Sequence, residues 1–445
     1  MSIFFLKLIA IFFSSLIFFQ SYITKKLVGT YIIPAAMFSV IWFLYTIIPL
    51  LILPTIQINP LSVLYIFICS FSFGISALPF NWKKAFAKNK SKKEKVYCTF
   101  NSSFLRYIFY TSCILAFVFS TLIMITNGFS MALLMSNLLE TSGLYAAMRG
   151  HEELDYGLLG VLSIFFTYFT PMLGAIVVEF SSERVVRRRF LLFLSFAPSL
   201  YCMITQSTKL ALLVAIIFYL ATTLVMKIYA NKLVLFNFKS ILKKSVYIFI
   251  LLPLISISFL SRQGNSNFSD QKEALGIIKY SLNTYAFAQI YAFSDFFSFT
   301  VGMKSETSYK DDYNSYGYYT FKSIFDSFGG KKKFPPGYFE ESYYVKDVFE
   351  TNVFTVFRSL IYDFGLIGTI FFFFLFGLFV HFFFYRLLFL NNSWISVTIF
   401  IISMVFIMLS YLFSIFTARY IFLLGAGFFL VLLSNGYLSR PKKIS

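Results

Sequence analysis

The sequence predicts an all-α polytopic membrane protein with about eleven transmembrane helices and one large extracytoplasmic loop. Hydrophobic residues make up 58% of the 445 residues and charged residues only 13%, whereas a soluble domain carries roughly a quarter charged residues. Apolar runs of about 20 residues recur along the chain, and each is long enough to cross a bilayer. The runs are continuous rather than alternating, which favours helices over the strands of a β-barrel.

The apolar runs define the predicted helices in chain order. The first run has neither a basic n-region nor a small-residue cleavage site, so we expect a retained helix rather than a signal peptide. No internal repeat and no symmetric pair of broken helices is visible, although inverted repeats are common in secondary transporters. The predicted spans cover residues 3–20, 31–53, 61–82, 107–126, 158–180, 190–206, 208–227, 246–261, 363–385, 394–414 and 420–437.

Strongly basic segments orient these helices, because positively charged loops stay in the cytoplasm. Either two or four predicted spans separate each basic segment from the next, so all four can lie on the cytoplasmic side. The segments are residues 83–106, 181–189 and 228–245 and the C-terminal tail with Arg440, Lys442 and Lys443.

The segment 262–356 is predicted to face away from the cytoplasm. It contains ten Lys or Arg residues and eleven Asp or Glu residues and is nearly neutral, while the whole chain carries +19. The contrast supports the orientation independently of the helix count. It also divides the chain into an N-terminal bundle of about eight spans (1–261), the large loop (262–356) and a C-terminal segment of about three spans (357–445).

Composition and motifs exclude several function classes. The excess of positive charge follows membrane topology, so we expect no nucleic-acid partner. The cytoplasmic loops contain no Gly-rich phosphate loop and no dinucleotide fingerprint. The chain has two histidines and four scattered cysteines without a CxxC pair, which predicts neither a metal site nor a disulfide framework. No cofactor is expected.

The outward loop 127–157 contains the first candidate site. Arg149 can bind phosphate, because its planar guanidinium donates two hydrogen bonds to phosphate oxygens. His151, Glu152 and the neighbouring acids could transfer protons. The alternative is an ordinary solvated loop at the membrane interface.

Tyrosines are frequent in the large loop. Their rings can pack on sugar faces while their hydroxyls form hydrogen bonds, which makes a carbohydrate groove plausible. Tyrosines also gather at membrane interfaces for reasons unrelated to binding. The stretch around Tyr285 is predicted to be weakly helical. The tyrosines concerned are Tyr280, Tyr285, Tyr291, Tyr309, Tyr313, Tyr316, Tyr318, Tyr319, Tyr338, Tyr343 and Tyr344.

The stretch from Asn352 to Gly368 runs into the predicted span 363–385. Arg358 and Asp363 are expected at the entrance of this helix, where charges can stay partly hydrated, and charges there are costly unless they are paired or functional. Gly365, Gly368 and Gly377 would permit close helix contact. Arg262 and Arg419 are expected at the outer interface, either as anchors or as anion ligands.

This stretch resembles a known family. Asn352-Val-Phe-Thr355 followed by Tyr362-Asp363-Phe364-Gly365-Leu-Ile-Gly368 is similar to the segment after the large periplasmic loop of O-antigen polymerases, the Wzy-type oligosaccharide repeat-unit polymerases. The turn Gln206-Ser-Thr-Lys209 before a long helix also resembles that family, although Arg is more usual than Lys209. Arg149 fits its Arg-bearing outer loop, and Pro34 with Trp42 is similar to its N-terminal pattern.

The resemblance implies a metal-independent glycosyltransferase in the bacterial cytoplasmic membrane. It would polymerise undecaprenyl-diphosphate-linked repeat units into lipopolysaccharide O-antigen or capsule, with a flippase and a chain-length regulator as partners. Cations must stabilise the departing diphosphate, and a base must accept a hydroxyl proton. The predicted diphosphate ligands are Arg149, Arg358, Arg262, Lys209 and Arg419; the predicted substrate-binding residues are Asn352, Thr355, Tyr285 and Tyr362; and the base could be Asp363, Glu152 or His151.

Two other functions remain open. A ligase would move the glycan from the same lipid to another acceptor. A flippase for lipid-linked oligosaccharide would need cations within its helices, yet the outer cations here lie mostly at predicted helix ends. The sequence therefore favours surface chemistry over transport.

Overall fold

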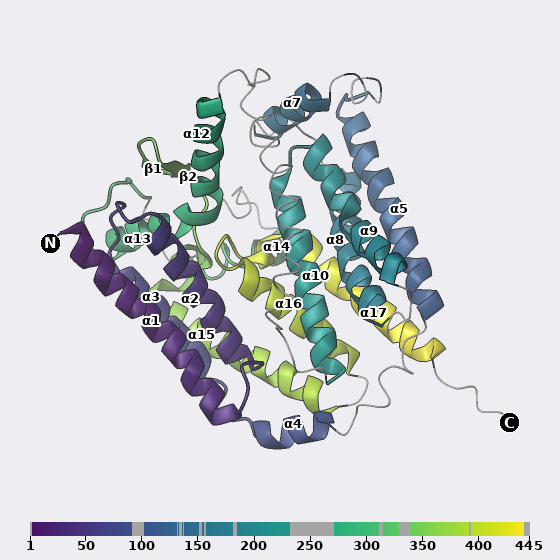
Figure 1. The fold of residues 1–445 in the computed structure, drawn as a ribbon, viewed down its shortest axis with the longest axis horizontal. Coiled ribbons are helices and arrows are strands. Elements are labelled where there is room, and N and C mark those ends of the chain that lie inside the picture. The colour runs from purple at the N-terminus through teal and green to yellow at the C-terminus, as the bar shows by residue number, and fades with distance from the viewer. Residues whose placement is uncertain are drawn as a thin grey trace. The chain divides into compact units, whose positions relative to one another are not determined.

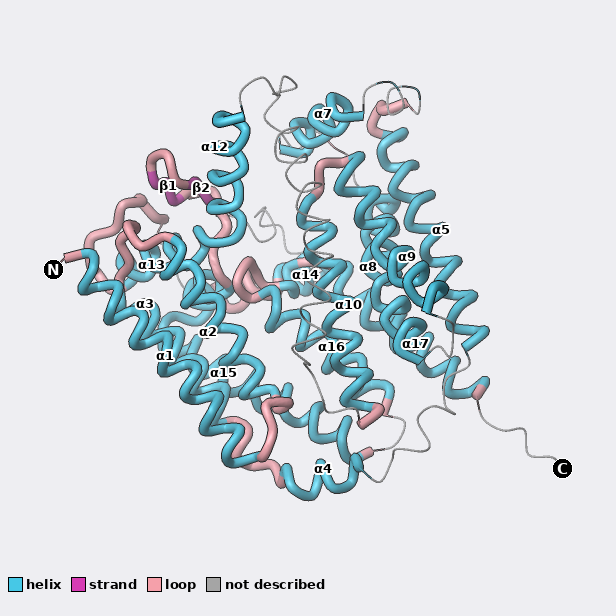
Figure 2. The backbone as a smooth tube through the Cα atoms, in the orientation of Figure 1, coloured by secondary structure: helices cyan, strands magenta, loops and turns pink. Residues whose placement is uncertain are grey.

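The protein is an all-α membrane protein with several helices that can cross a bilayer. The computed structural model describes residues 2–90, 102–130, 132, 136, 138–150, 154, 157–180, 185–231, 271–310, 315–328, 339–390 and 393–439. Among these residues, seven helices are long and apolar enough to span a membrane, and two shorter apolar helices cover Pro60–Ile75 and Trp394–Leu409. The fold class is confirmed at this level (Figure 2). The predicted span 246–261 lies outside the described residues, so the count of eleven stays a prediction.

The chain forms two compact units. Unit 1 contains Met1–Lys88, Lys279–Leu390 and Ser403–Ile421, and unit 2 contains Asn89–Ile278, Asn391–Ile402 and Phe422–Ser445. This division does not follow the predicted boundaries at 261 and 356, because each unit combines segments from both halves of the sequence.

Unit 1 is built on α1 (Ile3–Val28), α2 (Pro34–Ile52) and α3 (Pro60–Ile75), which pack against one another (Figure 1). Apolar side chains gain little by leaving lipid for a neighbouring helix, so small and polar side chains hold such helices together. Ser14 of α1 and Thr46 of α2 are 2.6 Å apart, and Ser39 of α2 and Ser70 of α3 are 3.1 Å apart. Both pairs are buried.

Helix α15 (Val356–Phe389) packs against α3. Gly377 permits this contact, because a Cβ at that position would lie 2.2 Å from Ser76 Oγ. The expectation that Gly377 allows close helix contact is confirmed. His381, one turn further on, accepts a hydrogen bond from the Ala35 amide through Nε2 at 3.1 Å, and its Nδ1 lies 2.7 Å from the Gly377 carbonyl oxygen. A neutral His381 thus caps the start of α2.

The backbone of α15 breaks at Gly365, which has φ 68° and ψ −179°. This conformation is accessible essentially only to glycine. A short helix therefore precedes the break, and the long apolar part of α15 follows it. Gly365 acts as a backbone hinge point rather than as a helix-packing residue, since a Cβ there would meet nothing within 4 Å. A Cβ at Gly368 would meet Phe364 across the break at 2.8 Å.

Part of the predicted large loop is a buried helix. A π-helical turn, η2 (Asn283–Phe287), leads into α13 (Ala288–Thr300), which packs against α2, α3 and α15. Residues 288–298 are all buried. Beyond it lie α14 (Lys322–Ser327) and an antiparallel hairpin of β1 (Tyr343–Val345) and β2 (Phe349–Thr351), in which Tyr343 faces Thr351.

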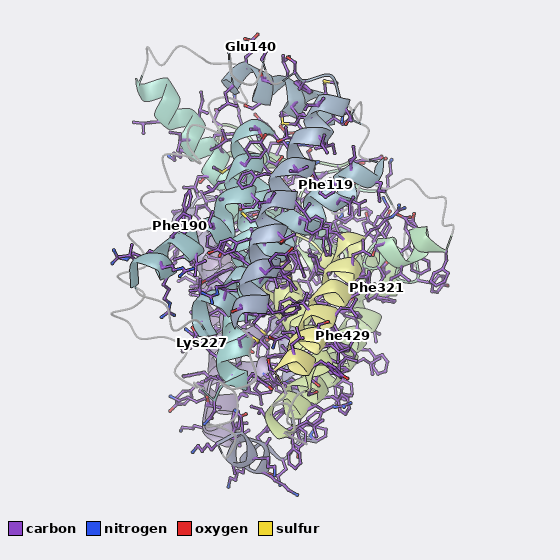
Figure 3. All side chains as sticks on the ribbon, turned by 90° about the vertical axis from the view of Figure 1, so that its right-hand side faces the viewer. Phe119, Glu140, Phe190, Lys227, Phe321 and Phe429 are labelled. Carbon is purple, nitrogen blue, oxygen red and sulfur yellow. The ribbon has the colours of Figure 1, made fainter. Side chains whose placement is uncertain are left out.

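Unit 2 contains α5 (Ser102–Thr126), α7 (Leu138–Gly150), α8 (Gly157–Phe180), α9 (Val185–Thr205), α10 (Lys209–Tyr229) and most of α17 (Tyr420–Leu438). Two buried hydroxyl pairs join α5 to α8: Ser112 with Thr170 at 2.9 Å, and Ser120 with Ser163 at 2.8 Å. Figure 3 shows Glu140 on α7 and Lys227 near the end of α10 towards opposite ends of these helices.

Three predicted loops contain helical structure. The basic segment 83–106 begins as helix α4 (Trp82–Lys90). Helix α9 begins at Val185, so Arg187, Arg188 and Arg189 lie in its first turns rather than in a loop. The loop 127–157 contains α7. Helix α12 (Gln271–Leu282) and α16 (Trp394–Leu409) each contribute residues to both units.

Candidate functional site

Arg149 lies against the turn that precedes α10. Its Nη1 donates to the Thr208 hydroxyl and, at 3.3 Å, to the Gln206 carbonyl oxygen. The turn is unusual because Ser207 has φ 50°, a left-handed conformation that non-glycine residues rarely adopt. The Ser207 hydroxyl is buried and has no hydrogen-bond partner. Two predicted features that are distant in the sequence, Arg149 and the turn 206–209, therefore meet in unit 2.

The N-terminus of α10 makes this turn electropositive. Lys209 is the first residue of α10 and is half-buried. Thr208 precedes it but makes no side-chain cap bond to the helix, because its hydroxyl is engaged by Arg149 and Gln206. The first amides of a helix carry a partial positive charge and readily bind anions. Through its contact with Thr208, which is next to Lys209 in the sequence, Arg149 therefore lies at the N-terminal end of α10.

Arg358 is the centre of a second cluster, in unit 1. Its side chain is fully buried, in contrast to the partly hydrated position expected from the sequence. The guanidinium carbon lies 3.7 Å from the ring centre of Phe339 and 4.0 Å from that of Phe354. Three further rings lie within 5.3 Å, so the cation is held by aromatic faces. The aromatic box consists of Phe296, Tyr309, Phe339, Phe354 and Tyr362.

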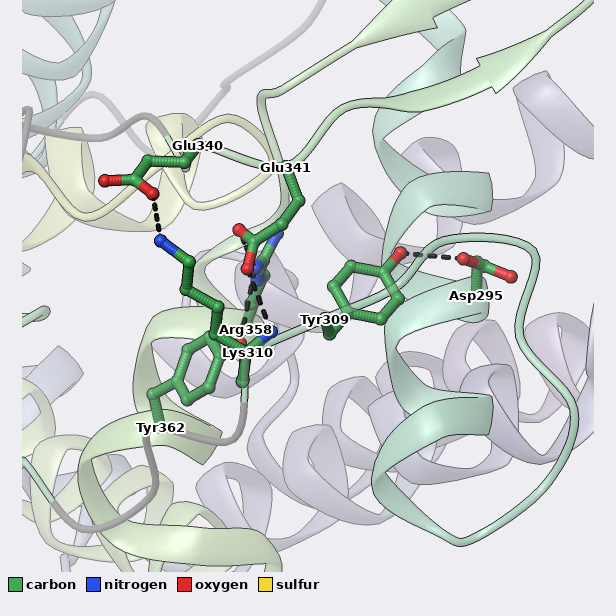
Figure 4. A network of polar contacts seen from close by, with 7 residues as sticks. All are labelled: Asp295, Tyr309, Lys310, Glu340, Glu341, Arg358 and Tyr362. Atoms are coloured by element: carbon green, nitrogen blue, oxygen red, sulfur yellow. Dashed lines mark hydrogen bonds and ion pairs between the residues drawn. The ribbon is translucent and has the colours of Figure 1, made fainter.

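Glu341 supplies the negative charge opposite Arg358 (Figure 4). Arg358 Nη2 donates to Glu341 Oε2 at 2.8 Å, and the Lys310 amide donates to Oε1 at 3.1 Å. Partial burial by itself would raise the pKa of the Glu341 carboxyl, but Arg358 and the hydrogen bonds outweigh it and hold that pKa below its usual value. Glu341 is therefore ionised at neutral pH. Arg358 Nε and Nη1 have no hydrogen-bond partner.

Asp295 of α13 holds one loop over this cluster. Its Oδ1 accepts from the Glu306 amide at 2.7 Å, and its Oδ2 accepts from the Thr307 amide at 3.1 Å and from the Tyr309 hydroxyl at 2.8 Å. Tyr309 is thereby fixed with its ring 5.0 Å from the Arg358 guanidinium. Asp295 is a positioning residue that the sequence did not single out.

Asp363 holds a second loop in the same way. Its Oδ1 accepts from the Tyr319 amide at 2.9 Å and from the Ser315 hydroxyl, and its Oδ2 accepts from the Thr320 amide at 2.7 Å. The break at Gly365 frees the carbonyls of residues 362 and 363, which accept from the Ser315 and Tyr316 amides. Asp363 is 1% exposed and thus serves the loop 315–320. Its role as a base stays a prediction.

The predicted substrate residues of unit 1 differ in exposure. Tyr362 is buried, accepts from Arg358 Nη2 at 3.3 Å and donates to the Lys310 carbonyl oxygen at 2.9 Å. Thr355 is buried at the start of α15, and its hydroxyl has no partner. Asn352 is exposed, and its carbonyl accepts from the Phe339 amide. Tyr285 lies in the π-helical turn and is 44% exposed.

Arg419 is an exposed cation of unit 1. Its side chain is 63% exposed and pairs with Asp326 of α14 at 3.3 Å. This pair is separate from the aromatic box, since no contact between Arg419 and the box occurs among the ion pairs and cation–π contacts of the described residues. The remaining predicted residues, His151, Glu152 and Arg262, lie outside the described residues.

Comparison with known proteins identifies no matching family model, no similar curated protein and no similar solved structure. Within the described part of the chain, no group of three or more His, Cys, Asp or Glu side chains is arranged to hold a metal ion. The functional interpretation therefore depends on the two cationic clusters.

Sequence reasoning missed Glu341 and Asp295. The only sequence signal for Glu341 is that it belongs to an adjacent acidic pair, Glu340-Glu341. Its partner Arg358 is 17 positions away, and the contact depends on the path of the intervening hairpin. Asp295 occurs in an aromatic helix without any motif.

Proposed function

We propose that this protein is a membrane glycosyltransferase that polymerises undecaprenyl-diphosphate-linked oligosaccharide units at the outer face of a bacterial cytoplasmic membrane. The observation that carries the proposal is the contact of Arg149 with the turn at the start of α10. It supports an anion site in a polytopic membrane protein, and a lipid-linked diphosphate is an anion that such a protein meets in the bilayer.

The chemistry of the Arg149 cluster suits a diphosphate. A guanidinium donates bidentately to phosphate oxygens, and a lysine adds a second positive charge. Helix amides at the start of α10 can donate to the same group. The Ser207 hydroxyl has no protein partner and is available as a further donor.

The Arg358 cluster supports the carbohydrate side of the proposal. It holds an ionised and partly exposed carboxylate, Glu341, in place through a buried cation that is enclosed by aromatic rings. Glycosyl transfer from a diphosphate requires charge stabilisation for the leaving group and a group that accepts the hydroxyl proton. A ligase would use the same chemistry on a different acceptor, and a flippase would use the anion site without bond cleavage.

The proposal is tested by replacing Arg149 and following glycan chain length in cells. Arg149→Ala should abolish long chains, and Arg149→Lys should reduce them roughly 10-fold or more, because it keeps the charge but loses the bidentate fork. Thr208→Val should have a smaller effect, since it removes only the hydroxyl that orients Arg149. Each variant is expressed in a strain from which the gene for this protein is deleted. The measurement is the distribution of surface-polysaccharide chain lengths, read as a ladder on a gel.

Arg188→Ala is the matched control. Arg188 is also an arginine of unit 2, half-exposed and weakly paired with Glu179 at 3.8 Å. It should leave the ladder unchanged. A normal ladder in Arg149→Ala would remove Arg149 from the site. Deletion that leaves lipid-linked units on the cytoplasmic face would instead indicate a flippase, and long chains that remain on the carrier lipid would indicate a ligase.

A further inference from the structure

Among the described residues of unit 1, five carboxylates have hydrogen bonds or ion pairs around the cluster, and they differ in what they leave available. Asp295 and Asp363 each accept three hydrogen bonds from the loops that they hold, and they are 8% and 1% exposed. Asp326 is paired with Arg419, whose side chain is 63% exposed, and Glu340 is paired with Lys310 at the surface; pairs with an exposed cation orient a carboxylate weakly. Glu341 remains.

Glu341 accepts one hydrogen bond from Arg358 and one from the Lys310 amide. The backbone amide of Glu341 also stabilises the charge of this carboxylate. An ionised carboxylate offers about four acceptor positions, so the contacts made within the described residues leave at least one for a substrate. Its side chain is 14% exposed, whereas that of Arg358 is 0% exposed. The carboxylate is thus fixed from behind by a buried cation and remains accessible from one side.

Resting on the proposed function, we propose that Glu341 accepts the proton of the acceptor sugar hydroxyl during glycan transfer, with Arg358 as the residue that orients it. The hydroxyl proton moves to a Glu341 oxygen, and the hydroxyl oxygen forms a bond to the anomeric carbon of the donor. The bond between that carbon and the diphosphate oxygen breaks, and its electron pair leaves with the lipid diphosphate. The proton then passes from Glu341 to water.

The surroundings of Glu341 suit this step. Tyr309, Phe339 and Tyr362 are buried around Arg358, so their rings hold the guanidinium in place behind Glu341. Arg358 is fully buried and acts on the step only through Glu341, whose carboxylate it keeps ionised and oriented. A weak base is sufficient, because bond breaking to a diphosphate leads and the hydroxyl becomes acidic as its oxygen bonds to carbon.

Within the described part of the chain, the charged and titratable groups drawn around Glu341 in Figure 4 come from α15 and from two loops. Arg358 and Tyr362 belong to α15, and Tyr309 and Lys310 belong to the segment that follows α13. Glu340 is next to Glu341 in the sequence (Figure 4). The Lys310 side chain pairs with Glu340. Burial would raise the pKa of Glu341, but Arg358 and the hydrogen bonds to the carboxylate outweigh burial and keep that pKa below its usual value.

The test uses the full-length protein in proteoliposomes. The substrate is the pool of lipid-linked units extracted from cells that lack the gene. Glu341→Gln should slow polymer formation by about 100-fold or more, which is the usual contribution of a general base. Glu341→Asp should retain an intermediate rate. Binding of the extracted units, followed by co-sedimentation with the proteoliposomes, should change less than about threefold in both variants.

Glu340→Gln is the matched control, because Glu340 is adjacent, 64% exposed and paired only at the surface. It should polymerise at the wild-type rate. Polymerisation by Glu341→Gln within about threefold of wild type would overturn the assignment of Glu341 and leave the proposed function standing. Failure of the wild-type protein to polymerise would overturn the proposed function itself.

The wild-type pH profile gives a result that does not depend on folding of the variants. A base must be deprotonated, so activity should fall only as the pH drops through the lowered pKa of Glu341. The value of kcat/KM should therefore stay constant from pH 7 to about pH 5. A fall with its midpoint between about pH 6 and 7 would indicate a histidine, such as His151, and would overturn the proposal.

Discussion

Arg358 shows how one buried charge can organise a set of loops. Burial of an isolated guanidinium is costly, and here Glu341 and five aromatic rings offset that cost. The rings come from α13, from α15 and from segments around residues 309, 339 and 354. Each of these segments is therefore stabilised by its contact with Arg358, and the contacts depend on one another.

A double-mutant cycle should expose this dependence. Glu341→Leu leaves the buried cation of Arg358 without a counter-charge and should lower stability by roughly 3–5 kcal/mol. Adding Arg358→Met should recover part of the loss, because no unpaired charge remains. Thermal denaturation of the purified protein in detergent measures both. Glu340→Leu, which breaks the surface pair with Lys310, should cost less than about 1 kcal/mol. Equal losses for Glu341→Leu and the double variant would contradict the expected coupling.

At the scale of elements, the break in α15 connects the long apolar helix to the loop 315–320. Gly365 ends one helical segment and starts the next, and the carbonyls released by the break bind the loop 315–320. The same helix carries Arg358 and Asp363 on the N-terminal side of the break. The membrane helix and the candidate site are thus joined through a single glycine.

Gly365→Ala should destabilise the protein by roughly 1–3 kcal/mol, since an L side chain is strained at φ 68° even though space is available. The hydrogen bonds between the loop 315–320 and the carbonyls of residues 362 and 363 should weaken at the same time. Gly276→Ala on α12 is the control, because Gly276 has no neighbour within 4 Å and no positive φ, and alanine favours helix there. Thermal denaturation should separate the two variants. Unchanged stability in Gly365→Ala would show that α15 can straighten.

At the scale of the whole molecule, the orientation in the membrane rests on charge. The described cysteines Cys69, Cys113 and Cys202 are buried, and Cys98 lies outside the described residues. Exposed positions on the hairpin and on α4 are available as reporters. Lys346 follows β1, and Lys84 lies in α4. The positive-inside rule places them on opposite sides of the membrane.

One cysteine introduced at each of these positions tests on which side of the membrane the position lies. In a Cys98→Ser background, Lys346→Cys should react with an impermeant maleimide in intact cells. Lys84→Cys should react only after the membrane is permeabilised. The fraction labelled is read by a mass shift on gels. Labelling of Lys84→Cys but not of Lys346→Cys in intact cells would reverse the orientation, and with it the proposed outer location of the site.

Part of the candidate site was visible in the sequence. Arg149, the turn 206–209 and the segment with Arg358, Tyr362 and Asp363 stood out by residue type and position. Their grouping did not, because Arg149 reaches Thr208 across 59 positions and Glu341 reaches Arg358 through a hairpin. Contacts of this kind depend on loop paths, which hydrophobic periodicity does not encode.

The sequence by itself determined the membrane class and the main apolar helices, because hydrophobic length and loop charge act locally and can be read along the chain. The tertiary structure decided that α13 is a buried helix within the expected loop and that α15 breaks at Gly365. It also decided that Arg358 is enclosed rather than hydrated. Burial and hydrogen-bond pairing belong to segments brought together by folding, so no single stretch of sequence carries them.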